Sequence, residues 1–387
     1  MTVAAIFSLS DHQFMQRAID LAALGCYTTA PNPNVGCVIV RDNVVVGEGY
    51  HRQAGGPHAE VFALRQAGAA AEGATAYVTL EPCSHFGRTP PCADALIAAG
   101  LSRVVVAMQD PNPKVSGTGV GRLRAAGIQV DVGLLETQAE ALNPGFLHKM
   151  RTQLPYVRLK LACSTDGKVA LANGQSQWLT GVDAREDVQR WRAQSCAILS
   201  TAETVKADKA MLNVRSEAVT CLENGAIRQP LRVILDRRCR LTGDEPLFQQ
   251  GGDILLCHAG PAEEWPVLTP AQEPAARQVM RVRLGLDDVG QFDLHELLRM
   301  LGSRQINSLW VEAGSMLATS FWQRQLIDEF VLYQAPMLLG ADALPMLKAG
   351  GLNQLAQAPR WQWQDVRLIG ADLRLTALLK KSAPSER

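Results

Sequence analysis

The chain has 387 residues, of which 47% are hydrophobic and 20% charged, an ordinary globular composition that excludes disordered and collagen-like classes. At roughly 100 to 200 residues per domain, this length predicts two domains, with three possible. The 38 basic residues balance 38 acidic ones, so no broad positive field attracts nucleic acid or an anionic membrane, and a small-molecule partner is favoured.

Residues 1–11 lack the basic and apolar regions of a signal peptide, and no run approaches the ~20 apolar residues of a membrane span. The nine cysteines are an odd number scattered over a long chain, which argues against a disulfide framework. We therefore expect reduced thiols and a cytoplasmic protein.

Apolar spacing in the first part of the chain predicts strands that alternate with helices. The expected elements are a helix over 14–24 ended by Gly25, a hairpin of 35–40 and 44–46, a helix from 58 to just before Gly68, a strand over 77–80, a helix over 94–99 and a strand over 104–108. Such alternation predicts an α/β layer sandwich.

The pattern weakens after Val132, apart from a helical patch over 136–142, so we place a domain boundary near 145–152, giving domains 1–150 and 151–387. A second series of apolar, strand-like runs then predicts another α/β domain. These runs are 157–161, 197–199, 231–235, 254–257, 308–311 and 330–333. Two polar stretches, 216–229 and 259–278, are expected to be surface loops.

The strongest chemical signal in the first domain is His58-Ala59-Glu60 followed by Pro82-Cys83 and Cys92. A catalytic zinc site has three protein ligands and one open position, and one His with two thiolates satisfies that count. His-x-Glu followed by Pro-Cys is the signature of zinc deaminases, in which the Glu is not a ligand. Zinc makes hydroxide available near neutral pH, while the carboxylate moves the proton on to leaving ammonia.

Two other interpretations of these residues stay open. They could be unrelated buried side chains, since free Cys is often buried. They could also form a closed structural zinc site, for which His85 or His51 would supply the fourth ligand. The two cysteines lie nine residues apart instead of the usual three, so we expect an extra loop there that lines the substrate pocket.

Longer motifs around these residues resemble the bifunctional riboflavin biosynthesis deaminase/reductase family. They are residues 32–36 (NPNVG), 49–51 (GYH), 57–61 (PHAEV) and 81–92 (EPCSHFGRTPPC), and the nine-residue cysteine spacing is that family's own. The resemblance implies a cytidine-deaminase-like α/β/α sandwich. It also implies zinc ligation by His58, Cys83 and Cys92, proton transfer by Glu60, and a pocket lined by Asn32, His51 and His85.

The second domain has no Gly-x-Gly-x-x-Gly after a strand, so it gives no local support to an ordinary Rossmann fold. A strand over 308–311, a turn over 312–314 and a helix over 315–324 would present free N–H groups to a phosphate. A strand–turn–helix connection of this kind also occurs in α/β proteins that bind no phosphate there. Residues 159–168, 174–180, 192–194, 311–314 and 336–340 resemble the family's reductase domain, a relative of dihydrofolate reductase.

The resemblance implies that this domain delivers hydride from NADPH to the ribosyl group of a phosphorylated substrate. The implied nucleotide-site residues are Ala162, Trp178, Thr204, Asp208, Arg237, Gly314, Ser315, Met316, Leu317, Ala318, Thr319 and Ser320. The implied substrate-site residues are Ser176, Arg192, Leu212, Arg215 and Glu312, with Lys160 and Asp208 as candidates for proton handling. Arginine suits a phosphate, although either arginine could instead form a surface ion pair.

One segment departs from the family. Residues 207–215 read ADKAMLNVR, where the family usually has Ala-Asp-Asp-Pro before a Leu-Thr-x-Arg element. The first Asp and the final Arg are kept, the second Asp, the Pro and the Thr are not, and the loss of proline is expected to loosen a loop. The leading hypothesis is hydrolytic deamination of 2,5-diamino-6-ribosylamino-4(3H)-pyrimidinone 5′-phosphate, followed by reduction to 5-amino-6-ribitylamino-uracil 5′-phosphate, in a homo-oligomer. The alternatives are an active deaminase with an impaired, ligand-binding reductase domain, and a nucleic-acid base deaminase.

Overall fold

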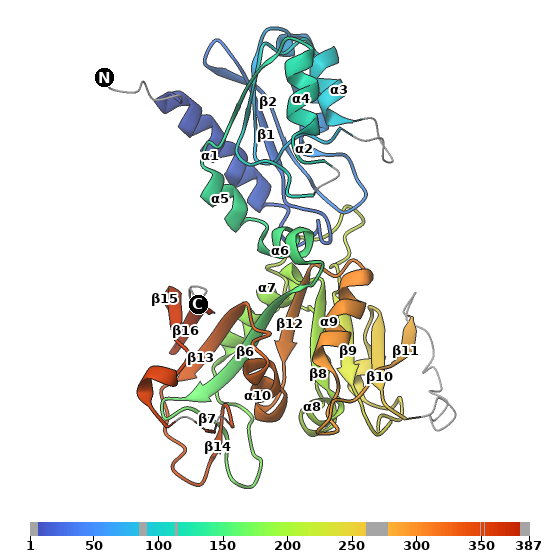
Figure 1. The fold of residues 1–387 in the computed structure, drawn as a ribbon, viewed down its shortest axis with the longest axis vertical. Coiled ribbons are helices and arrows are strands. Elements are labelled where there is room, and N and C mark those ends of the chain that lie inside the picture. The colour runs from blue at the N-terminus through green and yellow to red at the C-terminus, as the bar shows by residue number, and fades with distance from the viewer. Residues whose placement is uncertain are drawn as a thin grey trace, which may run out of the picture. The chain divides into compact units, whose positions relative to one another are not determined.

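The computed structural model describes residues 7–84, 91–112, 115–260, 278–348, 350–351 and 353–379 (Figure 1). The chain divides into two compact units. The first is Met1–Gln153 with Thr220–Ala226, and the second is Leu154–Val219 with Ile227–Arg387. Each unit has its own hydrophobic clusters, so each is described by itself.

The described strands of the first unit form one sheet in the order β2-β1-β3-β4-β5. Strand β1 is antiparallel to β2 and β3, whereas β3, β4 and β5 are parallel. The elements are α1 Leu9–Ala23, β1 Gly36–Arg41, β2 Val44–Tyr50, α2 Ala59–Ala67, η1 Gly68–Ala71, β3 Thr75–Val78, α3 Cys92–Ala98, β4 Arg103–Val106, α4 Thr118–Ala125, β5 Gln129–Val132, α5 Glu136–Ala141 and α6 Pro144–Thr152.

Alternate residues of these strands pack on opposite faces of the sheet. Ile39, Val78 and Val104 pack with α2, α3 and α4 in one cluster. Val38 and Val105 pack with α1, α5 and α6 in the other. Because successive side chains of a strand point to opposite faces, the unit is the three-layer α/β/α sandwich that the sequence predicts.

The described part of the second unit contains a long sheet in the order β11-β10-β9-β8-β12-β6-β13-β16-β15, parallel from β11 to β13 and antiparallel at β16 and β15. A short antiparallel pair joins β14 and β7. The elements are β6 Tyr156–Ser164, β7 Lys168–Ala170, α7 Val182–Gln194, β8 Ala197–Thr201, α8 Ala202–Asp208, β9 Leu231–Leu235, η2 Pro246–Gln249, β10 Ile254–His258, β11 Val279–Arg283, α9 Leu294–Ser303, β12 Ser308–Glu312, α10 Ser315–Gln323, β13 Glu329–Ala335, β14 Leu344–Pro345, η4 Leu355–Gln357, β15 Trp361–Ile369 and β16 Asp372–Leu379.

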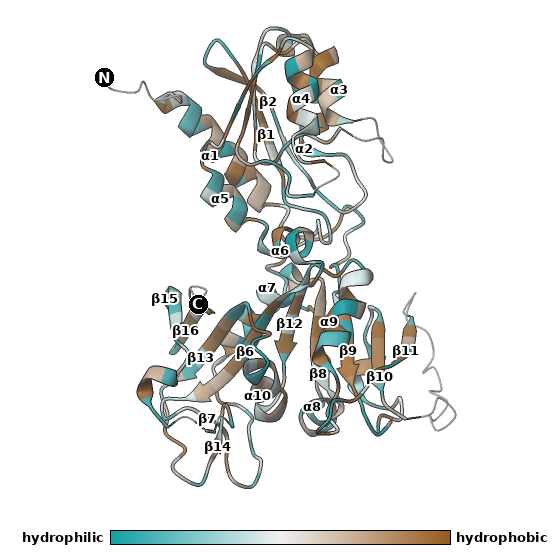
Figure 2. Cartoon of the chain, in the orientation of Figure 1, coloured by the Kyte–Doolittle hydropathy of each residue, from teal (hydrophilic) through white to brown (hydrophobic). Residues whose placement is uncertain are grey.

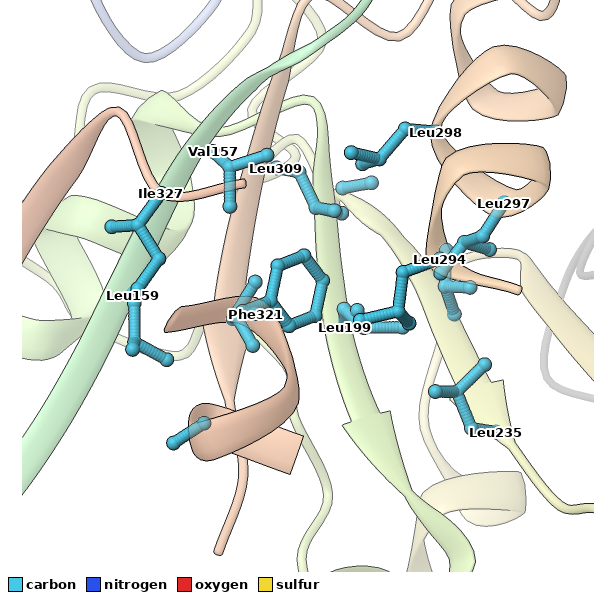
Figure 3. Packing of buried hydrophobic residues seen from close by; sticks show 14 of the residues in the cluster. Val157, Leu159, Leu199, Leu235, Leu294, Leu297, Leu298, Leu309, Phe321 and Ile327 are labelled. Atoms are coloured by element: carbon cyan, nitrogen blue, oxygen red, sulfur yellow. The ribbon is translucent and has the colours of Figure 1, made fainter. Parts of the chain in front are cut away.

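The central parallel strands of this sheet are hydrophobic along their length, because helices cover both faces (Figure 2). On one face, Phe321 of α10 and Leu297 of α9 pack against Leu309 and Leu199 (Figure 3). On the other face, α7 and α8 pack against a cluster that includes Trp310. The second unit is therefore also an α/β layer structure, as the sequence predicts.

Several predicted elements have different bounds in the structure. Helix α1 begins earlier than predicted, because Ser8 and Asp11 form a capping box. The predicted hairpin is confirmed, with β2 extended to Tyr50. Helix α4, for which the sequence predicts no element, begins at Thr118 after the N-cap residue Gly117. The polar stretch 216–229 contains no helix or strand, and most of 259–278 lies outside the described residues.

Other elements were missed altogether. The elements with no counterpart among the predicted ones are helices α4, α6, α7, α8 and α9 and strands β5, β7, β11, β14, β15 and β16. Strand β15 is exposed along most of its length, so it lacks the buried apolar signal that marks the central strands. Among the helices of the described ranges, none has the length and apolar character to span a bilayer.

Candidate active sites

The structure brings His58, Cys83 and Cys92 together in the first unit. The Nδ1 atom of His58 lies 3.6 Å from the Cys83 sulfur and 3.3 Å from the Cys92 sulfur. One ligand atom from each residue falls within a group no wider than 4.8 Å. The three residues thus offer a nitrogen and two sulfur atoms to one point, which is the donor set of a catalytic zinc site with an open fourth position.

Two of these three residues lie where a helix begins. His58 is the N-cap residue of α2, and Cys92 is the first residue of α3. Cys83 is joined to that helix by backbone contacts: the N–H of Cys92 donates to its sulfur at 3.3 Å, and the N–H of Ala93 donates to its carbonyl at 3.1 Å. The two cysteines are therefore held together through the start of α3, although nine residues separate them in sequence.

Glu81 anchors the segment that carries Cys83. Its buried carboxylate accepts three backbone N–H groups, from Asp110 at 3.1 Å, Gly117 at 3.0 Å and Val120 at 3.1 Å. Val120 lies in helix α4, and so does Gly119. Because Gly119 has no side chain, the Pro82 carbonyl approaches it so closely that a Cβ atom on residue 119 would lie 2.0 Å from the Pro82 oxygen. The Pro82-Cys83 segment is thereby fixed against α4.

The charges of the site fit a divalent cation. The pKa of Cys83 is lowered to about 4, because Cys92 donates to its sulfur and His58 lies beside it. The pKa of Cys92 is raised well above its usual value, because it donates to Cys83 and is buried. Without a cation the site thus accommodates one thiolate, since two adjacent negative charges repel. A bound metal is what would allow both sulfurs to ionise.

Glu60 lies in the first turn of α2, two residues after His58, with only 3% of its surface exposed. Burial raises the pKa of its carboxyl group, and the nearby His58 opposes that rise. Its Oε2 atom has no hydrogen-bond partner. A buried carboxylate oxygen without a partner is costly, so this atom is placed to receive a proton from a bound molecule.

His51 and Asn32 form a connected pair beside the candidate metal ligands. The Nδ1 atom of His51 lies 2.9 Å from the Pro57 carbonyl oxygen, and its Nε2 atom lies 3.1 Å from the Asn32 side-chain nitrogen. Burial lowers the pKa of His51, which favours the neutral ring. Its Nδ1–H therefore donates to Pro57 and its Nε2 accepts from Asn32, which leaves the Asn32 Oδ1 atom as an acceptor. His85, predicted to line the same pocket, lies outside the described residues.

In the second unit, Arg192 and Glu312 form a bidentate ion pair with separations of 2.6 and 2.8 Å. The Trp310 indole N–H also donates to Glu312 at 2.7 Å. Burial alone would raise the pKa of Glu312, but Arg192 and Lys160 outweigh it and lower the pKa to about 2. Burial lowers the pKa of Lys160, which pairs with Glu312 in the register of β6 and β12.

Asp208, Ser176 and Thr204 lie around helix α8. Asp208 is the last residue of that helix and accepts a hydrogen bond from Ser176 at 3.5 Å, while Thr204 lies in its first turn. Trp178 is 67% exposed and its ring lies 4.6 Å from the Arg185 guanidinium, whereas Ala162 is partly buried on β6. Exposed aromatic surface of this kind is available to stack on a ligand.

The other predicted residues of this unit differ in exposure. Arg215 is exposed and donates to the Asn213 side chain at 3.1 Å, whereas Leu212 is 2% exposed. Arg237 is exposed and donates to the Gly290 carbonyl. Of the two arginines predicted for the substrate site, Arg215 is thus the one with an exposed side chain, while Arg192 is paired with Glu312.

Residues Gly314 to Ser320 form the start of α10, with Gly314 as its N-cap residue. Gly314 and Met316 are exposed and Leu317 and Ser320 partly buried, whereas Ser315, Ala318 and Thr319 are buried. The Thr319 hydroxyl donates to the Ser315 carbonyl at 2.6 Å and accepts from the Lys348 N–H at 2.8 Å. Ala318 packs in the core, so the exposed part of this turn is its N-terminal end.

The chain was compared with protein-family models and with curated relatives. Residues 155–375 match the RibD C-terminal domain, and residues 8–108 match the cytidine and deoxycytidylate deaminase zinc-binding region. The riboflavin biosynthesis protein RibD of Escherichia coli is 49% identical over 95% of this chain and 99% of that protein. RibD of Haemophilus influenzae is 50% identical over 96% of this chain and 98% of that protein. The chain belongs to the RibD family.

Solved structures of the family agree with this assignment over 96% of the chain. Acinetobacter baumannii RibD, form 1, is 45% identical with a TM-score of 0.86, covering 96% of this chain and 99% of that one. The deaminase/reductase of Thermotoga maritima is 33% identical with a TM-score of 0.82 and the same coverage. The chain is thus a bifunctional deaminase and reductase of riboflavin biosynthesis, with zinc in the deaminase domain and NADPH in the reductase domain.

Sequence reasoning did not find Glu81, Gly119 or the glutamine side chains around Arg215. Glu81 did fall inside a quoted motif, but its three partners lie 29 to 39 residues further along the chain. A carboxylate directly before the Pro-Cys pair is the one local signal that could have drawn attention to it.

Proposed function

We propose that the first unit hydrolyses the 2-amino group of 2,5-diamino-6-ribosylamino-4(3H)-pyrimidinone 5′-phosphate. We further propose that the second unit reduces the ribosyl group of the deaminated product to give 5-amino-6-ribitylamino-uracil 5′-phosphate. The Thermotoga maritima relative is described as a diaminohydroxyphosphoribosylaminopyrimidine deaminase and 5-amino-6-(5-phosphoribosylamino)uracil reductase, which are these two activities. The observation that carries the first step is the buried Glu60 carboxylate, with its partnerless oxygen, beside the His58, Cys83 and Cys92 cluster.

In the deaminase, His58, Cys83 and Cys92 would hold the zinc ion, which when bound supplies an activated water molecule. Glu60 would accept the proton from that water and later deliver it to the departing ammonia. Its raised pKa matches this double role, because a carboxyl group that ionises nearer neutral pH both takes and returns a proton readily.

Asn32 would position the pyrimidine in this pocket. His51, held as the Nδ1–H tautomer by the Pro57 carbonyl, accepts from the Asn32 side-chain nitrogen and so fixes the orientation of that amide. The Asn32 oxygen is then available to accept from an N–H of the substrate, a requirement that discriminates against rings lacking the donor. We propose that His85 also contacts the substrate.

In the reductase, NADPH when bound supplies the hydride. Ala162, Trp178, Thr204, Asp208, Arg237 and residues 314–320 would hold it, with the exposed Gly314 at the start of α10 facing a phosphate. Arg215 would bind the substrate's phosphate, and Ser176, Arg192, Leu212 and Glu312 would shape the sugar site. Lys160, buried beside Glu312 with a lowered pKa, would hand a proton to the opening ribose ring, with Asp208 nearby.

We also propose a cytoplasmic location and a homo-oligomer that binds no nucleic acid. Two thiols as close as Cys83 and Cys92 need a reducing compartment to remain metal ligands. The balanced charge of the chain disfavours binding to a polyanion. Strand β15 ends its sheet and exposes Trp363, Val366 and Leu368, an apolar surface that a second copy would cover.

The test is to incubate the zinc-loaded full chain with the diaminopyrimidinone ribotide, with and without NADPH, and to identify the products by mass spectrometry. We expect deaminated ribosyl product without NADPH and ribityl product with it. Glu60→Gln is the control that should lose the first product while still reducing supplied deaminated substrate. Unchanged substrate in both wild-type reactions would refute the proposed substrate.

A further inference from the structure

Residues 210–216 of the second unit connect α8 to the following loop without regular secondary structure. Leu212 and Val214 are each 2% exposed and Ser216 is 3% exposed, whereas Arg215 is exposed. Buried backbone N–H and C=O groups need hydrogen-bond partners, and an irregular segment cannot supply them from its own helix or strand. The partners of this segment therefore come from side chains elsewhere in the unit.

The Gln229 side chain supplies two of them, both to Val214. Its Oε1 atom accepts the Val214 N–H at 2.9 Å, and its Nε2 atom donates to the Val214 carbonyl at 2.8 Å. This is the paired exchange that a neighbouring strand makes with a residue in a sheet. One amide side chain thus fixes both backbone polar groups of the residue directly before Arg215.

The next backbone group along the segment is held by a second glutamine. Gln189 of α7 is 5% exposed, and its Oε1 atom accepts the Arg215 N–H at 3.1 Å. Arg192, also in α7, donates to the Asn213 carbonyl at 3.1 Å. The backbone is therefore anchored from Asn213 up to the N–H of Arg215 itself, although 207–215 contains no proline to stiffen it.

Charges of both signs lie near the Arg215 guanidinium. Burial and the nearby Arg192 lower the pKa of Arg215, with Arg185 adding to that effect and Glu312 and Glu186 opposing it. Arg192 is already committed to Glu312 through two hydrogen bonds. A phosphate group beside Arg215 would relieve the repulsion between the arginines and take a bidentate pair from an accessible guanidinium.

We propose that Gln229 is a positioning residue of the reductase: by clasping the Val214 backbone, with Gln189 holding Arg215 itself, it places the Arg215 guanidinium to receive the substrate's phosphate. The inference rests on the proposed function, in which Arg215 binds that phosphate. Gln229 does not touch the substrate, so its effect falls on substrate affinity and not on hydride transfer.

The first test compares Gln229→Met with wild type in the full chain, using deaminated ribosyl substrate and NADPH. Methionine keeps the length of the side chain but removes both hydrogen bonds. We expect the KM for the ribosyl substrate to rise about tenfold, with kcat within about threefold and the KM for NADPH unchanged. Inhibition by inorganic phosphate should weaken by the same factor. The matched control is Gln323→Met, at an exposed position of α10.

A second variant, Gln229→Glu, gives a signature that a purely structural role would not produce. The new carboxyl group can donate to the Val214 carbonyl only when protonated. The ratio of its KM to that of wild type should therefore be large at pH 8 and fall toward one at pH 5.5, at unchanged kcat ratio. The pH dependence of Gln229→Glu also tests the proposal if Gln229→Met fails to fold. A KM ratio that stays constant from pH 5.5 to pH 8 overturns the proposal.

Arg215→Gln separates this inference from the function on which it rests. If Arg215→Gln raises the KM while Gln229→Met leaves it within twofold of wild type, the clasp is wrong and the phosphate role stands. If Arg215→Gln leaves the KM and phosphate inhibition unchanged, Arg215 does not bind the phosphate and both fall together. Elevated KM in both single variants, with little further rise in the double variant, supports the clasp.

Discussion

Replacement of Gly119 by alanine should disturb the zinc site without touching a ligand. A Cβ at Gly119 would lie 2.0 Å from the Pro82 carbonyl oxygen and 3.3 Å from the Glu81 side chain, whereas ordinary van der Waals contact begins at 3.4 Å. At the shortest contact, the Pro82 oxygen belongs to the backbone and the new Cβ is bonded directly to it, so neither atom can rotate away. Helix α4 and the Pro82-Cys83 segment must therefore separate by about 1.4 Å.

A shift of that size is large for a metal site, because metal–ligand distances tolerate only about 0.2 Å. Loss of supporting contacts typically lowers metal affinity about 10- to 100-fold, and we expect Gly119→Ala to raise the zinc Kd by that factor. Overpacking should also destabilise the first unit by about 1–3 kcal/mol. Reduction of supplied ribosyl substrate should be unchanged, since Gly119 lies in the deaminase unit.

The zinc Kd would be measured by competition with a chromophoric chelator. Gly121→Ala is the matched control, because Gly121 lies two residues further along α4, is exposed, and has no atom within 4 Å of its potential Cβ. That change should leave zinc affinity intact and stabilise the helix by up to about 1 kcal/mol. Equal zinc affinities for the two variants would refute the reasoning that the Pro82 contact positions Cys83.

Three further outcomes are expected. Glu60→Gln should lower the deamination rate about 10²- to 10⁴-fold and leave reduction unchanged, as read by product analysis; retained deamination would exclude Glu60 as the proton carrier. Treatment with a zinc chelator should abolish deamination alone, and loss of reduction as well would place a metal requirement in the second unit. Glu312→Gln should destabilise the second unit by about 3–5 kcal/mol, because it leaves the largely buried positive charge of Arg192 without the negative charge that compensates it. The pKa of Glu312 is lowered from 4.5 to about 2, so its contribution to the free energy of unfolding is present above pH 4.5 and is lost as pH falls toward 2. Tryptophan fluorescence reports the unfolding of this unit, since every tryptophan lies beyond residue 150. If the stability of the variant fell with acid just as that of the wild type does, the assignment would be contradicted.

Local patterns explain why much of the fold could be predicted from the sequence. The prediction of a strand over 231–235 coincides with β9, and those of 254–257 and 308–311 fall within β10 and β12. Central parallel strands are buried on both faces and so appear as continuous apolar runs. Strand β15 gave no such signal because most of its side chains are exposed, and α4 was missed because its first residues include two glycines.

The sequence by itself determined which chemistry the first unit performs, because His58, Glu60, Cys83 and Cys92 stand in an order and spacing that few other sites share. Only the tertiary structure decided what holds these groups in place. Glu81 accepts N–H groups from residues 29 to 39 positions further along the chain, and Gln229 holds a residue fifteen positions away. A buried polar side chain needs a hydrogen-bond partner. The sequence near that side chain does not identify the partner, because the packing of the layers determines which distant residue comes close to it.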